Sequence, residues 1–141
     1  MQVSTESSHR SPRGLMNRCV MAARRMPRSR ASTAIASLVT ERDWQRQLCE
    51  LAEMLGYQWA HFRPAMRQSG AWSTPVSGAL GAGWPDLVLA RPGRFLMVEC
   101  KAEGAYLKPQ QKAVHDSLRA AGVEVHTFRP SDLELAAEVL R

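Results

Sequence analysis

No apolar run in the chain approaches the ~18 residues that a membrane-spanning helix needs, so we expect no membrane span. Cysteine is also scarce: Cys19, Cys49 and Cys100 are widely spaced, and no two of them form a CxxC pair. An odd count without that spacing argues against a disulfide framework and against a zinc finger. The cysteine content therefore fits a reducing compartment.

Acidic residues are almost absent from the first 38 residues, where Glu6 stands against seven arginines. The excess charge of +6 therefore lies in residues 1–38, and residues 39–141 sum to zero. Because this segment is rich in Ser and Arg and has no sustained apolar period, we expect most of it to be disordered. Three interpretations remain open: a dispensable extension or early start codon, a basic arm that contacts phosphates, and an organellar transit peptide.

Apolar periodicity predicts one α/β domain over residues 39–141. The expected elements are a helix capped by Thr40 and stopped by Gly56, strands at 57–62, 86–90 and 94–101, a helix at 109–121, a strand at 123–128, and a helix at 132–140 capped by Ser131. Residues 65–83 are rich in Ser, Gly and Pro, so we expect a long loop there. This α-β-β-β-α-β-α order predicts a mixed β-sheet flanked by helices on both faces.

Three charged residues interrupt the apolar strands on either side of a Pro92-Gly93 turn. Glu99 and Lys101 are two residues apart, so they project from the same face of their strand, and Cys100 points away. Asp86 lies about as far before the turn as Glu99 lies after it. A hairpin would therefore bring the two carboxylates close together, since cross-strand neighbours sit ~5 Å apart.

Two carboxylates ~4 Å apart repel each other by ~4 kcal/mol at an effective dielectric constant of 20. Such a pair must share a proton, find cations or bind a metal, and Lys101 supplies one positive charge. Hard oxygen ligands suit Mg²⁺ or Mn²⁺, which could activate a water and stabilise charge on a phosphate. The plain alternative is an exposed hairpin end with a surface ion pair worth ~0–1 kcal/mol. We favour the metal site because the charges lie at one end of otherwise buried strands.

Pro-Asp at 85–86 followed by Glu-Cys-Lys at 99–101 matches the PD-(D/E)XK nuclease signature. The chain resembles the VRR-NUC family more closely, in particular its small stand-alone members from phage and bacterial genomes. The resemblance runs from about Thr40 to Leu140 and rests on these segments: Glu41-x-x-Trp44-Gln45, Gly83-Trp84-Pro85-Asp86-Leu87, Val98-Glu99-x-Lys101, Pro109-x-Gln111, Ala121-Gly122-Val123-Glu124-Val125 and Arg129-Pro130-Ser131-Asp132. It implies a restriction-endonuclease-like fold and hydrolysis of DNA phosphodiesters with Mg²⁺ or Mn²⁺.

The resemblance also implies roles for individual residues. Asp86 and Glu99 would be metal ligands, together with the backbone carbonyl of Cys100. Lys101 would act on the attacking water. Glu41 would complete the acidic cluster directly or through water, although an acidic residue in the first turn of a helix also favours the helix dipole. Gln111 would face the site from the later helix and support Lys101 or the scissile phosphate, with Gln110 as its nearest rival.

Other side chains are weaker candidates. Gln45 lies one turn after Glu41 on the same helical face, so it is a candidate to reach the site. The histidines are more often structural or surface residues, and His115, one turn after Gln111, is the one to watch. Trp72 is the best candidate for touching nucleic acid. Five basic residues could bind phosphate, although each is more often a solvated charge: Arg63, Arg67, Arg91, Arg94 and Lys108.

The leading hypothesis is a metal-dependent DNA endonuclease, with flaps or four-way junctions as candidate substrates and with recombination, repair or phage DNA processing as candidate roles. A core of ~100 residues offers little surface for a duplex, so we expect a homodimer in the cytoplasm of a bacterium or of a phage-infected host. The alternative is a catalytically silent DNA-binding module with a nuclease fold. The intact Asp86, Glu99 and Lys101 argue against it. A restriction-type enzyme would need a recognition domain in addition.

Overall fold

The computed structural model describes residues 34–63, 65–66, 68–73 and 76–141. Residues 34–36, which precede the expected domain boundary at residue 39, form a helical turn, and Ala36 is buried. The rest of the basic extension lies outside the described residues, and its three interpretations remain predictions.

Four strands form one mixed sheet in the order β1-β4-β5-β6. β1 (Gln58–His61) and β5 (Arg94–Cys100) each pair antiparallel with β4 (Leu87–Arg91), which lies between them. β6 (Glu124–Phe128) runs parallel to β5, and α3 (Pro109–Ala120) connects the two. This last unit is a β-α-β crossover, which parallel neighbours require.

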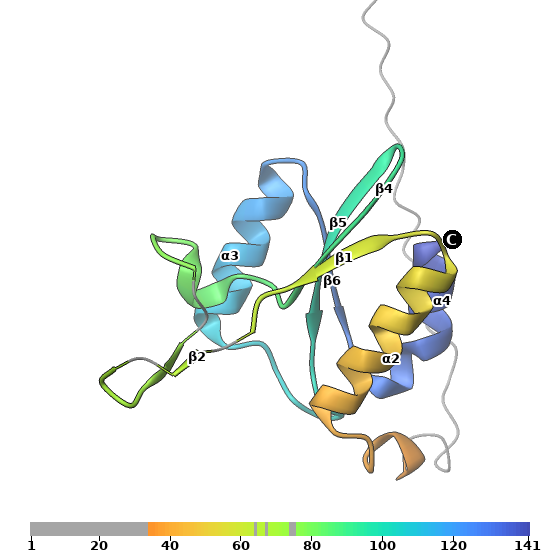
Figure 1. Ribbon diagram of the computed structural model, residues 1–141, viewed down its shortest axis with the longest axis horizontal. Helices are drawn as coiled ribbons and strands as arrows, with labels where there is room; N and C mark the ends of the chain where they lie inside the picture. The colour runs from red at the N-terminus through yellow and green to blue at the C-terminus, as the bar shows by residue number, and fades with distance from the viewer. Residues whose placement is uncertain (1–33, 64, 67, 74–75) are drawn as a thin grey trace, which may run out of the picture.

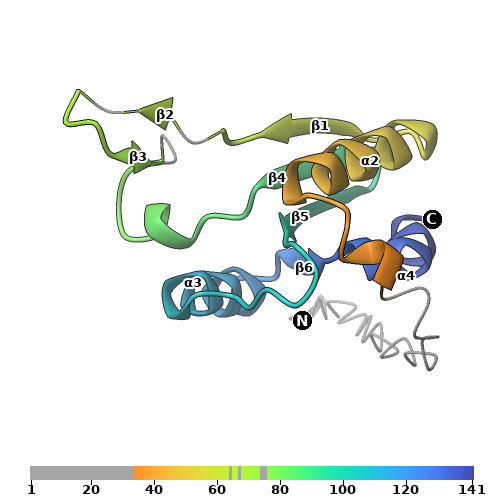
Figure 2. The ribbon, with the colours of Figure 1, turned by 90° about the horizontal axis from the view of Figure 1, so that it is seen from below.

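Helices cover both faces of this sheet, as Figures 1 and 2 show. α2 (Glu41–Met54) and α4 (Leu133–Leu140) pack together on one face, and α3 lies on the other. The predicted fold class, a mixed sheet flanked by helices, is therefore confirmed, and the arrangement is consistent with a restriction-endonuclease-like fold.

The strands alternate between two apolar clusters, which explains why the central strands tolerate so few polar residues. Leu87, Leu89, Leu96 and Val98 join the core beneath α2 and α4. Met97, on the opposite face of β5, packs against the apolar side of α3. Residues 96–100 of β5 are all buried, so a charged side chain in this part of the strand lies against one cluster or the other.

The segment expected to be one long loop contains short elements, so that prediction is wrong in part. β2 (Ala65–Met66) pairs with β3 (Trp72–Ser73), and η1 (Gly81–Gly83) forms a 3₁₀ turn. Two-residue strands are too short to leave a readable alternation in the sequence. The side chain of Trp72, expected to contact nucleic acid, lies outside the described residues.

The cap predicted for the first helix, α2, is present, and the cap predicted for the last helix, α4, is not. Thr40 caps α2 as predicted, since its hydroxyl oxygen accepts from the Asp43 backbone N–H at 3.1 Å. The last helix is preceded by η2 (Pro130–Asp132), and Asp132, not Ser131, occupies its N-cap position. The Asp132 carboxylate accepts from the Arg129 backbone N–H at 3.0 Å, which shapes this tight turn and moves the helix start to Leu133.

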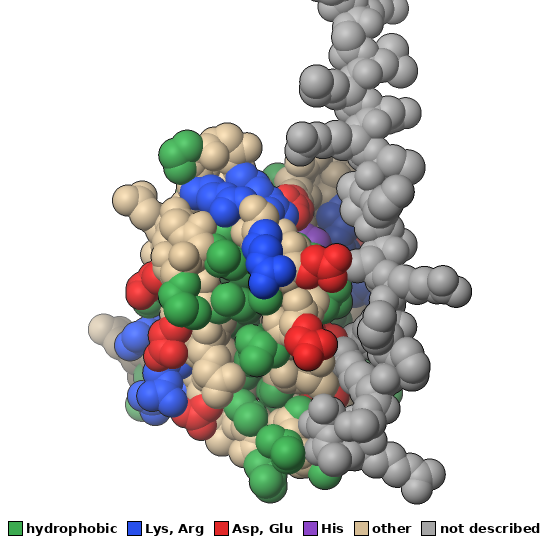
Figure 3. Space-filling view, turned by 90° about the vertical axis from the view of Figure 1, so that its right-hand side faces the viewer, with side chains coloured by type: hydrophobic (Ala, Val, Ile, Leu, Met, Phe, Trp, Pro, Cys, Tyr) green, Lys and Arg blue, Asp and Glu red, His purple; other side chains and the backbone are tan. Residues whose placement is uncertain are grey.

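In the part of the chain that the structure describes, none of the helices is long and apolar enough to cross a bilayer. Figure 3 shows the side of the domain formed by α2 and α4, where positive and negative side chains are mixed among apolar ones. This mixture is what a balanced charge over residues 39–141 predicts.

Candidate active site

The β4–β5 hairpin places Asp86 beside Glu99, as the sequence predicted. Gly93 adopts a φ of 76° in the turn, and the register that follows pairs Leu87 with Val98, the positions next to the two carboxylates. Asp86 directly precedes β4, and its Oδ2 atom accepts from the Cys100 backbone N–H at 2.8 Å. This bond fixes Asp86 to the end of the neighbouring strand.

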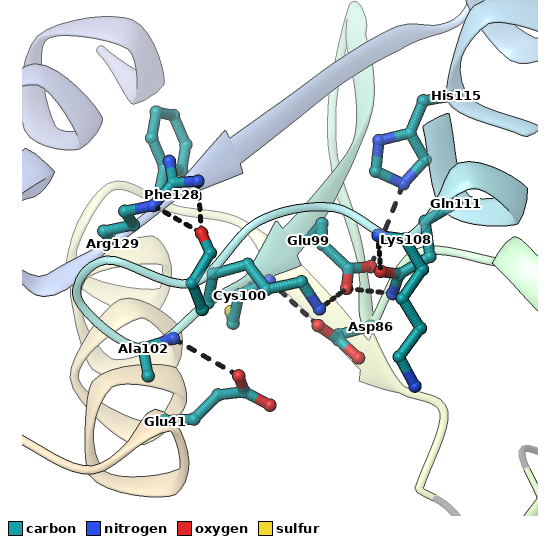
Figure 4. Close-up of polar contacts among 12 residues, drawn as sticks. Glu41, Asp86, Glu99, Cys100, Ala102, Lys108, Gln111, His115, Phe128 and Arg129 are labelled. Carbon is teal, nitrogen blue, oxygen red and sulfur yellow. Dashed lines mark hydrogen bonds and ion pairs between the residues drawn. The ribbon is translucent and has the colours of Figure 1, made fainter. Parts of the chain in front are cut away.

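Glu99 is fully buried on the α3 face of the sheet. Its Oε1 atom accepts from Lys101 Nζ at 2.5 Å and from Gln111 Nε2 at 2.5 Å. The predicted grouping of Glu99, Lys101 and Gln111 is therefore present in the structure, and Figure 4 shows Gln111 beside Glu99.

The other oxygen of Glu99 faces a histidine that few features of the sequence single out. Oε2 is buried and has no hydrogen-bond partner, and His115 Nε2 lies 3.8 Å from it. His115 is itself fully buried. Its spacing of one turn from Gln111 was the only signal in the sequence, because burial of a helical histidine depends on how the helix docks.

Burial, followed by repulsion from a neighbouring carboxylate, raises the pKa values of Glu99 and Asp86. The pKa of Glu99 rises to about 7, mainly because of burial and then because of the negative charge on Asp86, while Lys101 and Gln111 oppose the rise. The pKa of Asp86 is also raised, first by burial, although the Cys100 N–H and Lys101 favour its charged form. Paired carboxyls of this kind, one fully and one partly buried, are typical of sites that bind a cation.

Hydrogen bonds to the end of β6 hold the end of β5, next to Glu99, and also α2. The carbonyl of Phe128 accepts from the Lys101 backbone N–H at 3.0 Å and from Trp44 Nε1 at 3.0 Å. Trp44 is fully buried in α2, so this one carbonyl joins α2 to the ends of β5 and β6. The Cys100 side chain is buried in the core under α2, which confirms the predicted alternation, and burial raises the pKa of its thiol.

Gln111 reaches the site because of the way α3 begins. Its Oε1 atom accepts from the Lys108 backbone N–H at 3.1 Å, and Pro109 occupies the first turn of the helix. The amide group is thereby oriented with its nitrogen toward Glu99. The rival Gln110 is exposed.

Glu41, in the first turn of α2, lies near Asp86. Its Oε2 atom accepts from the Ala102 backbone N–H at 3.2 Å, and its negative charge contributes to the raised pKa of Asp86. Glu41 and Asp86 both line a pocket of about 160 Å³, together with these residues: Arg42, Gln45, His61 and Cys100. Gln45 therefore reaches this pocket.

His61 is a pocket residue that the sequence did not single out. It ends β1 and is half-buried, and burial together with the nearby Arg63 lowers its pKa. A neutral imidazole of this kind can donate or accept one hydrogen bond at the pocket wall. The sequence does not reveal this position, because β1 shows no regular alternation around it.

The donor set fits a small hard cation with few protein ligands. Mg²⁺ is usually held by one or two carboxylates, and substrate phosphates and waters supply the rest. Asp86 and Glu99 are adjacent, and Glu99 Oε2 has no partner of its own. Within the described ranges, no three His, Cys, Asp or Glu side chains are close enough to hold a metal by themselves. The roles of Glu41 and of the Cys100 carbonyl as ligands stay predictions.

Two of the basic residues considered for phosphate binding are engaged inside the domain. Arg91 donates to the Leu55 carbonyl at 3.0 Å and stacks on the Tyr57 ring at 4.5 Å. Arg94 forms an ion pair with Glu124 at 2.7 Å. Both guanidinium groups therefore have partners within the domain, and neither supports a phosphate site.

Comparisons with known proteins agree with this geometry. The sequence model of the VRR-NUC domain matches residues 43–131, which include Asp86, Glu99, Lys101 and Gln111. Neither the curated proteins nor the solved structures gave a match. The matched segment is well over half of the chain and carries the whole hairpin and the start of α3. The chain therefore belongs to the VRR-NUC family, whose domain implies a nuclease-type function with DNA as the substrate.

Proposed function

We propose that this protein is a metal-dependent DNA endonuclease, with Mg²⁺ or Mn²⁺ held by Asp86 and Glu99. The observation that carries the proposal is the pair of carboxylates at the end of the β4–β5 hairpin, Glu99 fully buried and Asp86 partly buried, with Lys101 bonded to Glu99. A pair of this kind is costly in the core unless cations neutralise it.

The bound ion would neutralise the two carboxylates and stabilise the negative charge that develops on the scissile phosphate. Asp86 is oriented for this task by the Cys100 N–H, and Glu99 by its donors from β5 and α3. Both ligands are therefore fixed before the substrate arrives, which lowers the cost of reorganisation during the reaction.

Lys101 is the residue assigned to the attacking water and to the pentavalent phosphorane. It follows β5 directly and is mostly buried, so its ammonium group stays next to Glu99. Gln111 shares the same Glu99 oxygen and limits the positions open to the lysine. Release of Lys101 from Glu99 as the cation binds would free its ammonium for the phosphate.

The adjoining pocket suits the nucleic-acid backbone. Arg42, Gln45 and His61 supply donors to its lining, and Glu41 and Asp86 supply carboxylates. Donors and carboxylates that line one pocket match a phosphate that bridges the protein and a cation. We assign this pocket to a phosphate of the DNA.

The first experiment is cleavage of labelled supercoiled plasmid, a 5′ flap and a four-way junction in Mg²⁺, Mn²⁺ and EDTA. We expect cleavage with either metal, none in EDTA, and a decrease of at least ~100-fold in Lys101→Ala, the range that one general acid–base group contributes. Lys112→Ala is the matched control, because Lys112 is exposed on α3 and pairs with the exposed Asp116. DNA binding that persists in EDTA without any cleavage in metal would replace the nuclease by a silent DNA-binding module.

We further propose that the protein acts as a homodimer in the cytoplasm. Two copies would supply two active sites and a longer contact with a duplex than one small domain offers. Light scattering of the full chain, alone and with a four-way junction, measures the mass directly. A monomer under both conditions would refute the dimer and leave the nuclease proposal standing.

A further inference from the structure

Two buried polar groups face each other behind the candidate active site, and neither has a hydrogen-bond partner. One is Glu99 Oε2, and the other is the imidazole of His115, whose Nδ1 and Nε2 atoms are both buried without a partner. The distance from Nε2 to Oε2 is 3.8 Å. Figure 4 shows the imidazole pointing from α3 toward the carboxylate.

Leaving both buried groups without a hydrogen-bond partner destabilises the folded state. A buried donor or acceptor without a partner costs ~1–3 kcal/mol, and more when the group is charged. Hydrogen bonds span ~2.7–3.2 Å, so a movement of less than ~1 Å in either side chain would satisfy both groups. A small movement would therefore make each group the hydrogen-bond partner of the other.

The tautomer decides how well the pair can be satisfied. With the proton on Nε2, His115 donates to Oε2, and only an acceptor nitrogen, Nδ1, remains without a partner. With the proton on Nδ1, a buried donor and a buried carboxylate oxygen both remain unpaired. Burial and the positive charges of Arg119 and Lys101 lower the pKa of His115, which agrees with a neutral ring carrying one N–H.

The helix supplies this donor together with a second one. Gln111 and His115 are four residues apart on α3, so their side chains leave the same helical face one turn apart. Gln111 binds Oε1, and His115 faces Oε2. Val114 and Leu118 anchor this face against Met97 of β5, so both donors are presented by one packed surface.

We propose that His115 is a positioning residue that donates from Nε2 to Glu99 Oε2. This bond would hold the Glu99 carboxylate in one orientation relative to Asp86. Each carboxylate oxygen can accept more than one bond, so Oε2 keeps a lone pair for a cation. Partners of this kind orient metal ligands, and their removal typically weakens metal binding 10- to 100-fold. The inference rests on the proposed metal role of Glu99.

The hydrogen bond is tested first, in the full chain with EDTA and without DNA. Long-range ¹H–¹⁵N NMR correlations report which imidazole nitrogen carries the proton. We expect the Nε2–H tautomer for His115, and a change in its ¹⁵N shifts in Glu99→Gln. The Nδ1–H tautomer, or shifts unaffected by Glu99→Gln, would overturn the proposal without any need for a His115 variant to fold.

Mn²⁺ affinity is tested second, by calorimetry on variants whose fold is checked by circular dichroism. We expect a 10- to 100-fold weaker affinity in His115→Leu and partial recovery in His115→Gln, whose amide can still donate. His126→Gln is the control, because His126 bonds Glu124 on β6, away from Glu99. Equal Mn²⁺ affinity in wild type and His115→Leu would overturn the role of His115 alone. A wild type that binds no Mn²⁺ would instead overturn the metal role of Glu99, whatever the tautomer.

Discussion

Glu99 has the most demanding environment of the candidate site residues. It is fully buried, lies beside a second carboxylate, and is compensated by Lys101 and Gln111 at one oxygen only. Without a bound metal ion, the protonated form of Glu99 is the easier one to bury. The site thus favours either a proton or a metal, and this preference has a measurable effect on stability.

The metal-free protein should become less stable as the pH rises. The pKa of Glu99 is raised from 4.5 to about 7, so between these values the folded state binds more protons than the unfolded state. The free energy of unfolding then falls as the pH rises through this window, by up to about 3 kcal/mol from this residue. Urea unfolding in EDTA at pH 5 and pH 8 measures the difference.

Glu99→Gln should remove most of this pH dependence, since the amide does not titrate. Glu138→Gln, an exposed position on α4, should leave it unchanged. A pH dependence that persists undiminished in Glu99→Gln would assign it to other groups and contradict the raised pKa.

At the scale of elements, the position of α3 depends on a glycine whose purpose the sequence does not reveal. A Cβ atom on Gly83 would lie 2.4 Å from the Gln110 carbonyl oxygen and 2.8 Å from Val114 Cγ2. η1 therefore packs directly on the backbone of α3, in the turn that carries Gln111. The loop before Asp86 is therefore in direct contact with α3, the helix that carries Gln111 and His115.

Gly83→Ala should push η1 away from α3 and destabilise the protein by about 1–3 kcal/mol, as overpacking typically does. It should also weaken Mn²⁺ binding, because Gln111 and His115 move with the helix. Ala82→Ser, at an exposed neighbouring position, is the control. Urea unfolding and calorimetry measure the two effects, and unchanged values for both would show that α3 can shift freely.

Much of this arrangement could be predicted from the sequence because it follows a period. The two-residue alternation placed Glu99 and Lys101 on one face and Cys100 in the core, and turn chemistry placed Asp86 across the hairpin. The pairing of β2 with β3 and the burial of His115 could not be predicted, because both depend on packing between distant segments. Nothing local distinguishes His115 from a surface histidine.

For the whole molecule, charge is divided unevenly between the folded domain and the extension. Residues 39–141 have no net charge, and the excess of +6 lies in the first 38 residues. A nuclease domain without net charge gains little from long-range attraction to DNA. The arginine-rich segment is then the main source of sequence-independent affinity, if it acts as a basic arm.

Removal of residues 1–33 should test this interpretation. We expect weaker DNA binding and a shallower dependence of log K on log salt, by ~0.9 for each phosphate that the arm neutralises in the full chain. Fluorescence anisotropy with a labelled duplex at low and at physiological salt measures the slope. Replacing the seven arginines by glutamine in the full chain separates charge from length. An unchanged slope in both variants would favour the dispensable extension.

The two-residue turn at Pro92-Gly93 has a consequence for how this protein can vary. Asp86 and Glu99 meet only because equal lengths of strand lead away from Arg91 and Arg94. Inserting or deleting one residue in either strand would turn one carboxylate toward α2 and separate the pair. Related chains should therefore differ freely in which residues form the turn, yet keep the number of residues between the two acids, or change it only by a loop that preserves the register.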